Sequence, residues 1–178
     1  MLHDVYISSA NLFNILPSWT ANISADFQWN KMNANLVEFI YPQRYSTWVA
    51  VATSLDLDRV KIQGSLLGTV VHESTKEDKK DIQRDWDKIT PTLMASWQPW
   101  NRENLFLRAF YKNIFRMPTF TEMHMAYMGT LSSYLKPEFT KQYNLGFVYS
   151  KNINSSFFLE GQVDAYYNEV TDKLLAIP

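Results

Sequence analysis

The chain has 178 residues, with 17 Lys and Arg against 18 Asp and Glu, and no cysteine. Because the charges nearly cancel, the chain has no excess of positive charge of the kind that nucleic-acid binding needs, and no nucleic-acid partner is expected. The lack of cysteine excludes disulfides, a thiolate nucleophile and cysteine-ligated metals. No window approaches the ~20 consecutive apolar residues of a membrane helix, but this leaves room for barrel strands, whose alternating signal is weaker.

Alternation of apolar and polar side chains predicts β-strands along most of the chain. Between 19 and 30 every second residue is apolar, from Trp19 to Trp29, and polar residues occupy the other positions. A period of two places the two sets on opposite faces of a strand. Pro91 lies within one such run, and because it lacks a ladder donor we expect it near a rim. In chain order the runs span 19–30, 45–57, 60–73, 86–98, 104–116, 141–150 and 157–168. The fold class is therefore expected to be all-β, an antiparallel up-and-down meander of about eight long strands, as part of a transmembrane β-barrel.

The connections predict that the two ends of this sheet differ. Alternate connections of a meander lie at opposite ends of the sheet. Outer-membrane barrels have short turns at one end and long loops at the other, and their strands need about 9–11 residues to cross a bilayer. Tight turns are expected at 16–18, 55–59, 98–104 and 151–156, and longer loops at 32–44, 74–85 and 117–139. Aromatic residues near strand ends, which would suit a membrane interface, are Trp19, Trp29, Trp86, Trp97 and Tyr167.

Three segments resemble the barrel of TonB-dependent outer-membrane receptors, especially those of Bacteroidetes-type bacteria. They are FRMPTFTEM at 115–123, LKPEFTKQYNLGF at 135–147 and DAYYNEVTDKLLAIP at 164–178, and ITPTLMASWQP at 89–99 fits more loosely. In the family, a box of FR, any residue, P, T or S, and F closes one strand on the outer side, and L-x-P-E opens the next. The resemblance implies a transporter of the bacterial outer membrane, with roughly 22 strands around a plug, energised through the TonB complex.

The chain departs from the complete family pattern. It shows no plug and no coupling segment, its N-terminus lacks the basic and apolar regions of a secretory signal, and it stops at LLAIP, in what should be an outer loop. Residues 1–178 are therefore expected to form a single partial β-barrel domain, a fragment of the C-terminal barrel. The expected partners are outer-membrane lipid, the rest of the barrel and plug, the TonB complex through absent segments, and a small-molecule nutrient: a siderophore, haem, a vitamin or a glycan. No resident cofactor is expected.

Charged residues of one parity are the candidate lumen lining. Three cations oppose the apolar face of the run 104–116. A cation at the bilayer midplane of a barrel costs roughly 2–4 kcal/mol, so these three should face the lumen. Two carboxylates of the run 157–168 lie on the same strand face as its polar residues and could pair with these cations. Pairing within the wall or against a plug, and direct contact with substrate, are the two alternatives for these side chains. The lumen-lining residues are Arg108, Lys112, Arg116, Glu160 and Asp164.

The long loop 117–139 is the candidate ligand-binding surface, with loop 74–85 beside it. Flexible methionines and aromatics make adaptable contact surfaces. Haem receptors of the family place a histidine between the two boxes, and His124 lies between Arg116 and Pro137. An axial haem ligand is therefore one hypothesis, and a methionine–histidine copper site is another. The ligand-binding candidates are Met117, Phe120, Met123, His124, Met125, Tyr127 and Met128.

Other functional classes are less compatible with the sequence or remain as alternatives. The sequence has no glycine-rich phosphate loop and no nucleophile elbow, so no enzymatic activity is expected. A complete eight-stranded outer-membrane barrel with an adhesin or structural role is one alternative. A soluble β-barrel or sandwich that binds an apolar ligand inside is the other, because alternation alone does not say which face is inward.

Overall fold

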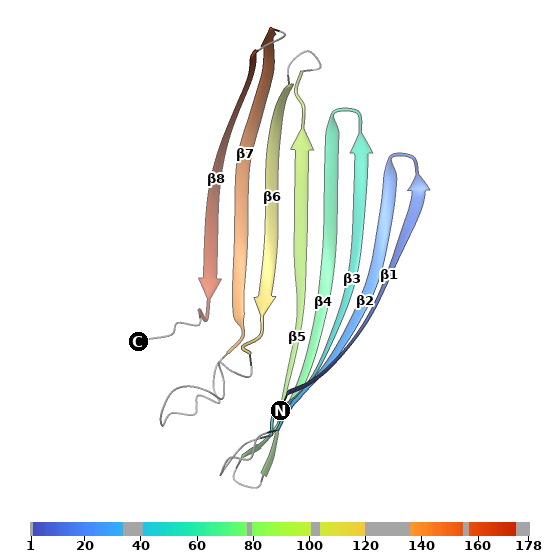
Figure 1. Cartoon of the computed structure of the whole chain (residues 1–178), viewed down its shortest axis with the longest axis vertical. Helices are drawn as coiled ribbons and strands as arrows, with labels where there is room; N and C mark the ends of the chain where they lie inside the picture. The colour runs from blue at the N-terminus through green and yellow to red at the C-terminus, as the bar shows by residue number, and fades with distance from the viewer. Residues whose placement is uncertain are drawn as a thin grey trace.

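Eight antiparallel strands make up the fold in a computed structural model, which describes residues 2–33, 41–77, 80–100, 104–119, 136–154 and 157–173. Each strand pairs with the next along the chain, so the sheet runs from β1 to β8 in chain order (Figure 1). The expected all-β meander is confirmed. The strands are β1 (Leu2–Leu16), β2 (Trp19–Met32), β3 (Gln43–Leu57), β4 (Val60–Glu77), β5 (Lys80–Trp97), β6 (Asn104–Arg116), β7 (Glu138–Asn154) and β8 (Phe157–Thr171).

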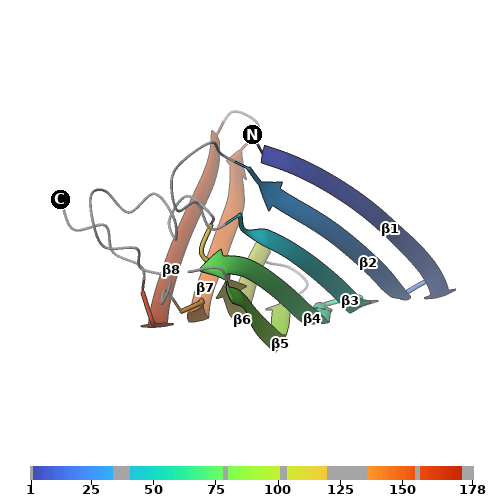
Figure 2. The same ribbon diagram turned by 90° about the horizontal axis from the view of Figure 1, so that it is seen from below.

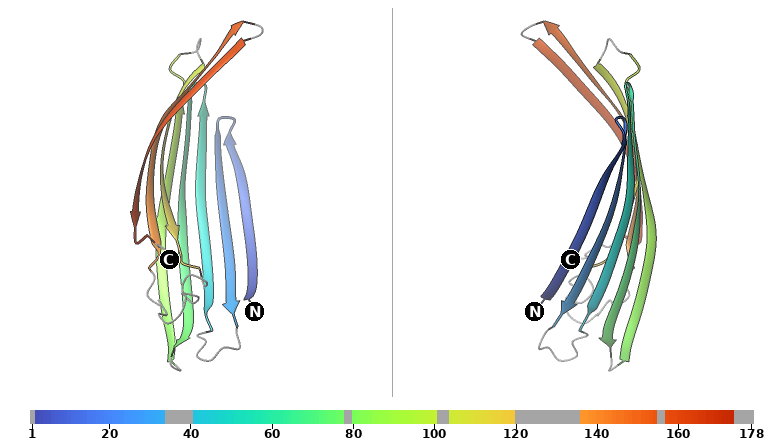
Figure 3. Two further views of the ribbon diagram at one scale, coloured as in Figure 1. Left: turned by 60° about the vertical axis from the view of Figure 1, so that its left-hand side comes forward. Right: turned by 90° about the vertical axis from the view of Figure 1, so that its right-hand side faces the viewer.

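The sheet is curved and open. Figure 2 shows the strands arranged along an arc, and Figure 3 shows the β7–β8 hairpin leaning at a marked angle to β1 and β2. Twisting and coiling of this kind follow from the right-handed twist of each strand. Among the described residues β1 and β8 do not pair with each other. The eight strands therefore form a wall with two free edges, not the closed eight-stranded barrel considered from the sequence.

The two faces of the wall follow from the register, because directly paired residues share a face. On β3 the odd-numbered residues are mostly apolar and exposed, as at Val49 (48%) and Val51 (50%), whereas the even-numbered residues Arg44 and Ser46 are buried. A soluble protein shows the opposite arrangement. We call the face that carries Val49 the convex face and the face that carries Arg44 the concave face.

The β4–β5 connection corrects one prediction from the sequence. Residues 74–85 were expected to be a long loop, but β4 continues to Glu77 and β5 begins at Lys80. The polarity of this segment was the reason for the error, because a hairpin with polar side chains on both faces has the composition of a loop. Opposite charges also face each other across the hairpin at Lys76 and Asp81, which favours strand pairing. Only two of the three connections at this end are therefore long.

Pro91 lies well inside β5 and not near its rim, which corrects a second prediction. The ladder with β4 continues through the pair Leu66–Pro91, but the ladder with β6 runs only between Thr92–Lys112 and Trp97–Leu107. A proline is tolerated inside a sheet where its missing N–H is not needed, and here one ladder ends at the residue beside it. Figure 1 shows β4 and β5 continuing together below the point where β6 ends.

Candidate functional site

An apolar band covers the convex face. Large apolar side chains are exposed there, with Leu66 55%, Ile89 70% and Leu145 65% exposed. Inside the band the Trp19 indole Nε1 donates to Thr53 Oγ1 at 2.8 Å, while the buried Trp29 Nε1 has no hydrogen-bond partner among the described residues. A contiguous exposed apolar surface of this extent marks contact with a membrane or another protein. At every second position, the band comprises 19–29, 45–57, 60–70, 89–97, 105–111, 143–149 and 159–167, from β2 to β8.

The band is slanted across the strands. On β2 its last aromatic residue is Trp29, before Lys31, and on β8 it is Tyr167, before Glu169. The pairing row through Tyr167 reaches Ala21 on β2, so the boundary moves by eight residues, from 21 to 29, over the six spacings between β2 and β8. With about 3.4 Å per residue and about 4.8 Å per spacing, this slant is ~43°. Transmembrane barrel strands tilt by about 35–45°, so the slanted band lies level when the strands are tilted to that degree.

Aromatic residues mark the edge of the band toward the long loops. The rings of Tyr111, Tyr143 and Tyr167 follow one another across β6, β7 and β8, with centroids 4.9 and 6.2 Å apart. The next row outward contains the ion pair of Lys141 with Glu169, at 3.3 Å. Of the aromatics expected at an interface, Trp19, Trp29, Trp97 and Tyr167 lie on the convex face. Trp86 pairs in register with Val71 on the concave face, so it does not belong to the aromatic edge of the band.

Hydrogen-bonded polar side chains lie on the concave face, together with apolar ones such as Trp48 and Val71. On β1 and β2, the Tyr6 hydroxyl donates to Asp26 at 2.9 Å and the Gln28 amide donates to Asp4 at 3.1 Å. The concave face carries these polar groups while the exposed apolar band lies on the other face, which contradicts the alternative of a soluble barrel that binds an apolar ligand inside. It can instead line an aqueous lumen or contact a polar partner.

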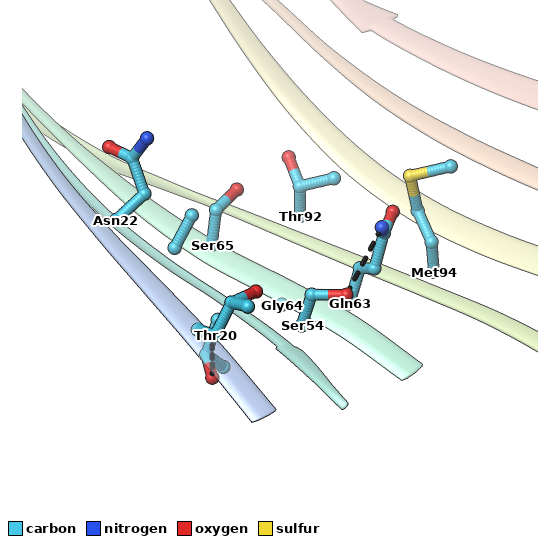
Figure 4. Close-up of a pocket in the computed structure, with 10 residues that line it drawn as sticks. Thr20, Asn22, Ser54, Gln63, Gly64, Ser65, Thr92 and Met94 are labelled. Atoms are coloured by element: carbon cyan, nitrogen blue, oxygen red, sulfur yellow. Dashed lines mark hydrogen bonds between the residues drawn. The ribbon is translucent and has the colours of Figure 1, made fainter. Parts of the chain in front are cut away.

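A pocket of about 260 Å³ opens on this face near the tight turns (Figure 4). Figure 4 shows side chains from β2 to β5 around one space, with the Gln63 amide donating to Ser54 Oγ at 3.3 Å. Hydroxyl and amide groups both donate and accept hydrogen bonds, so the pocket suits an uncharged polar group. Its hydrogen-bonding residues include Thr20, Asn22, Ser54, Gln63, Ser65 and Thr92.

A second, charged pocket of about 560 Å³ adjoins the first and shares Gln63 and Met94 with it. Two predicted residues meet here, since Arg108 Nη2 lies 3.4 Å from Asp164 Oδ1. These residues belong to β6 and β8, and the residue between them on β7 is Gly146. A Cβ at Gly146 would overlap Asp164 Oδ1, so the missing side chain lets the carboxylate reach across β7.

The other predicted charges share the concave face but not this pocket. Lys112 pairs in register with Gln142, Arg116 with Glu138, and Glu160 with Ser150. They are spread along the strands, with Arg116 at the long-loop end and Glu160 toward the tight turns. The five predicted residues are therefore brought to one face, where Arg108 and Asp164 form an ion pair with each other.

A buried ion pair near the long loops was not found from the sequence. Glu73 is 1% exposed and accepts from Arg44 Nε and Nη2 at 2.8 and 2.6 Å, both bonds reaching Oε2. Glu73 Oε1 has no hydrogen-bond partner among the described residues. Arg84 lies opposite Glu73 on β5, so the carboxylate stands between two arginines in register. The sequence does indicate that Arg44 lies on the same face of β3 as Ser46. Its pairing with Glu73 could not be predicted, because that depends on the register of β3 with β4.

Most of the predicted ligand-binding loop lies outside the residues that the structure describes. Met117 directly follows β6 and is described, whereas Phe120, Met123, His124, Met125, Tyr127 and Met128 are not. The haem and copper hypotheses at His124 therefore stay predictions. Within the described ranges, no group of His, Cys, Asp and Glu could hold a metal ion. No helix long and apolar enough to cross a membrane occurs in that part of the chain either.

Comparisons with known proteins agree with this architecture. Residues 13–178 match the family described as TonB dependent receptor-like, beta-barrel. Among solved structures, a double mutant of the Serratia marcescens hemophore receptor HasR, in complex with its hemophore HasA and heme, matches with a TM-score of 0.71. The identity is 17%, a level at which the likeness shows the fold alone, and the match covers 95% of this chain but 33% of the HasR chain. No curated protein sequence matches the chain.

Proposed function

The chain belongs to the TonB-dependent receptor-like β-barrel family, and from this premise we propose that it forms part of the wall of an outer-membrane receptor that binds and imports a scarce nutrient. The family is one of receptors and transporters, not an enzyme class. The observation that carries the proposal is the apolar band, exposed on the convex face and slanted by ~43°, as a tilted membrane-crossing wall requires. The Bacteroidetes-type assignment is part of the proposal and rests on the sequence segments at 115–123 and 135–147.

The concave face would then line the lumen. Arg108, Lys112, Arg116, Glu160 and Asp164 are the proposed lumen residues, and all five share that face in register. Short turns face the periplasm in outer-membrane barrels, so the two pockets near the tight turns would face a plug. The long loops, including 117–139, would meet the nutrient outside the cell. The remaining strands and the segment that contacts TonB would come from outside the wall formed by β1 to β8.

Adjacent residues of β7 test the membrane placement. Leu145 lies on the convex face and is 65% exposed, while Asn144 lies on the concave face. We expect Leu145→Arg to destabilise the assembled barrel by roughly 2–4 kcal/mol, the cost of a cation near the bilayer midplane, and Asn144→Arg to have little effect. Heat-modifiable migration of outer-membrane fractions and urea unfolding in lipid vesicles measure the difference. Equal effects of the two substitutions would contradict the proposed orientation.

Haem is a specific candidate for the nutrient. HasR was solved in complex with its hemophore and heme, and in this chain His124 lies between Arg116 and Pro137. A haem titration of the receptor in detergent should give a Soret shift that His124→Ala removes, with His72→Ala as the control for an unrelated histidine. The lack of any Soret change would eliminate haem and leave import of another nutrient to be tested.

A further inference from the structure

A groove lies where the ladder between β5 and β6 is interrupted. Beyond Thr92 and Lys112, toward the long loops, β5 and β6 no longer pair. A groove of about 660 Å³ occupies this region and is lined by residues of both faces. Trp86 and Lys88 belong to the concave face, whereas Ile89 and Phe115 belong to the convex face. The groove is therefore bounded by side chains of both faces of the sheet.

The groove lies at the edge of the apolar band. Ile89 is the last apolar residue of the band on β5, and Asp87 follows it toward the long loops. Phe139 and Thr171 complete the groove wall on β7 and β8, beside the row that contains the Lys141–Glu169 ion pair. If the band spans the hydrocarbon core, as the proposed function requires, the groove is level with lipid headgroups.

The charges in the groove favour an anion. Its lining holds Lys88 and Lys136 against one carboxylate, Asp172, which gives a net charge of +1. Neither lysine forms an ion pair with any residue in the described ranges. A phosphate attracts such lysines strongly at a membrane surface. The apolar part of the lining comprises Ile89, at the edge of the band, and Phe115 and Phe139, which lie one row beyond the row of Lys141 and Glu169.

We propose that this groove binds a membrane lipid with a phosphorylated headgroup, whose phosphate lies between Lys88 and Lys136, whose headgroup region contacts Phe115 and Phe139, and whose acyl chains extend from Ile89 along the apolar band. The proposal rests on the membrane placement proposed above. Charge and apolar contact are both necessary, which separates a lipid from free phosphate and from a neutral glyceride. The lipid would close the wall where the β-ladder does not.

Titration of the detergent-purified receptor with dioctanoyl phosphatidic acid, followed by calorimetry, tests the site. We expect saturable binding of phosphatidic acid. The double variant Lys88→Ala with Lys136→Ala should weaken this binding about 30-fold, because each lysine contributes a similar share of the attraction to the phosphate. Lys88→Arg with Lys136→Arg should retain binding. Lys61→Ala, at the tight-turn end, is the matched control and should leave it unchanged.

Two further probes complete the test. Inorganic phosphate and dioctanoyl glycerol should each bind far more weakly than phosphatidic acid, because each lacks one half of the interaction. Unchanged phosphatidic acid affinity in the double alanine variant would overturn the proposal, as would equal affinity for the neutral glyceride. If Leu145→Arg destabilises the barrel and Asn144→Arg does not, but the lysine variants bind phosphatidic acid normally, the lipid site alone is refuted. If Leu145→Arg and Asn144→Arg have equal effects on stability, the membrane placement is refuted.

Discussion

Two ion pairs on the same concave face differ in nearly every physical respect. Arg44 and Glu73 join adjacent strands near the long loops, at 2.6 Å and with the carboxylate 1% exposed. Arg108 and Asp164 reach across an intervening strand near the tight turns, at 3.4 Å, with side chains 43% and 29% exposed. Buried pairs become very costly when one partner is removed, whereas exposed pairs contribute little. One pair therefore holds adjacent strands together, and the other leaves its charges exposed on the concave face.

Removal of the buried carboxylate should have the largest effect. Glu73→Ala leaves Arg44 buried without its carboxylate and with Arg84 nearby in register. We expect a loss of about 3–5 kcal/mol in the free energy of unfolding, the usual cost of an uncompensated buried charge. Urea titration of the protein in lipid vesicles measures this loss.

The matched control is Glu160→Ala, an exposed carboxylate on the same face. Surface substitutions usually change stability by less than about 0.5 kcal/mol, and this result is expected here. A second variant, Arg44→Leu with Glu73→Leu, removes both charges and should recover most of the stability lost in Glu73→Ala. Similar losses for Glu73→Ala and Glu160→Ala would show that burial does not distinguish the two regions.

The glycine between Arg108 and Asp164 should have an intermediate effect. In Gly146→Ala the new Cβ overlaps Asp164 Oδ1 and lies 3.1 Å from the Val163 carbonyl oxygen. Overpacking of this kind costs about 1 kcal/mol when a short side chain can move away. The cost should shrink in an Asp164→Ala background, because the overlapping atom is gone. A double-mutant cycle compares the two backgrounds, and an equal cost in both would place the strain elsewhere.

The exposed ion pair itself should contribute least to stability. Arg108→Ala is expected to lower the free energy of unfolding by less than about 1 kcal/mol, as measured for other exposed pairs, and to leave assembly intact. If the charges serve the lumen, nutrient uptake in cells should fall although the receptor reaches the membrane normally. Loss of assembly in Arg108→Ala would instead give the pair a structural role like that of Arg44 and Glu73.

Local patterns in the sequence were sufficient for the strands and their faces. Alternation is a property of a single strand, so the run 104–116 coincides with β6, and the parity of Arg108 and Asp164 placed both on one face. β1 was not among the alternating runs, because neither face of this edge strand is consistently apolar. The segment 74–85 was misread since polarity alone does not separate a hairpin from a loop.

Features that depend on the fit between strands could not be derived in the same way. The Arg44–Glu73 pair needs the register of β3 with β4, and Gly146 matters only because Asp164 lies beside it on the next strand. The proline at position 91 indicates that one backbone hydrogen-bond donor is missing from β5. It does not indicate that the ladder with β6, and not the ladder with β4, ends beside it. Comparison of many related sequences would supply such information, since it depends on pairs of positions.

The end of the β5–β6 ladder beside Pro91 has a mechanical consequence. Each intact ladder resists separation of its strands, so any widening of the wall near the tight turns must break backbone hydrogen bonds between β5 and β6. Toward the long loops β5 and β6 share no such bonds. The strands β1–β5 and the strands β6–β8 can therefore move apart there, with the remaining β5–β6 ladder as the hinge. The separation of β5 and β6 can then change near the long loops while the ladder keeps it fixed near the tight turns.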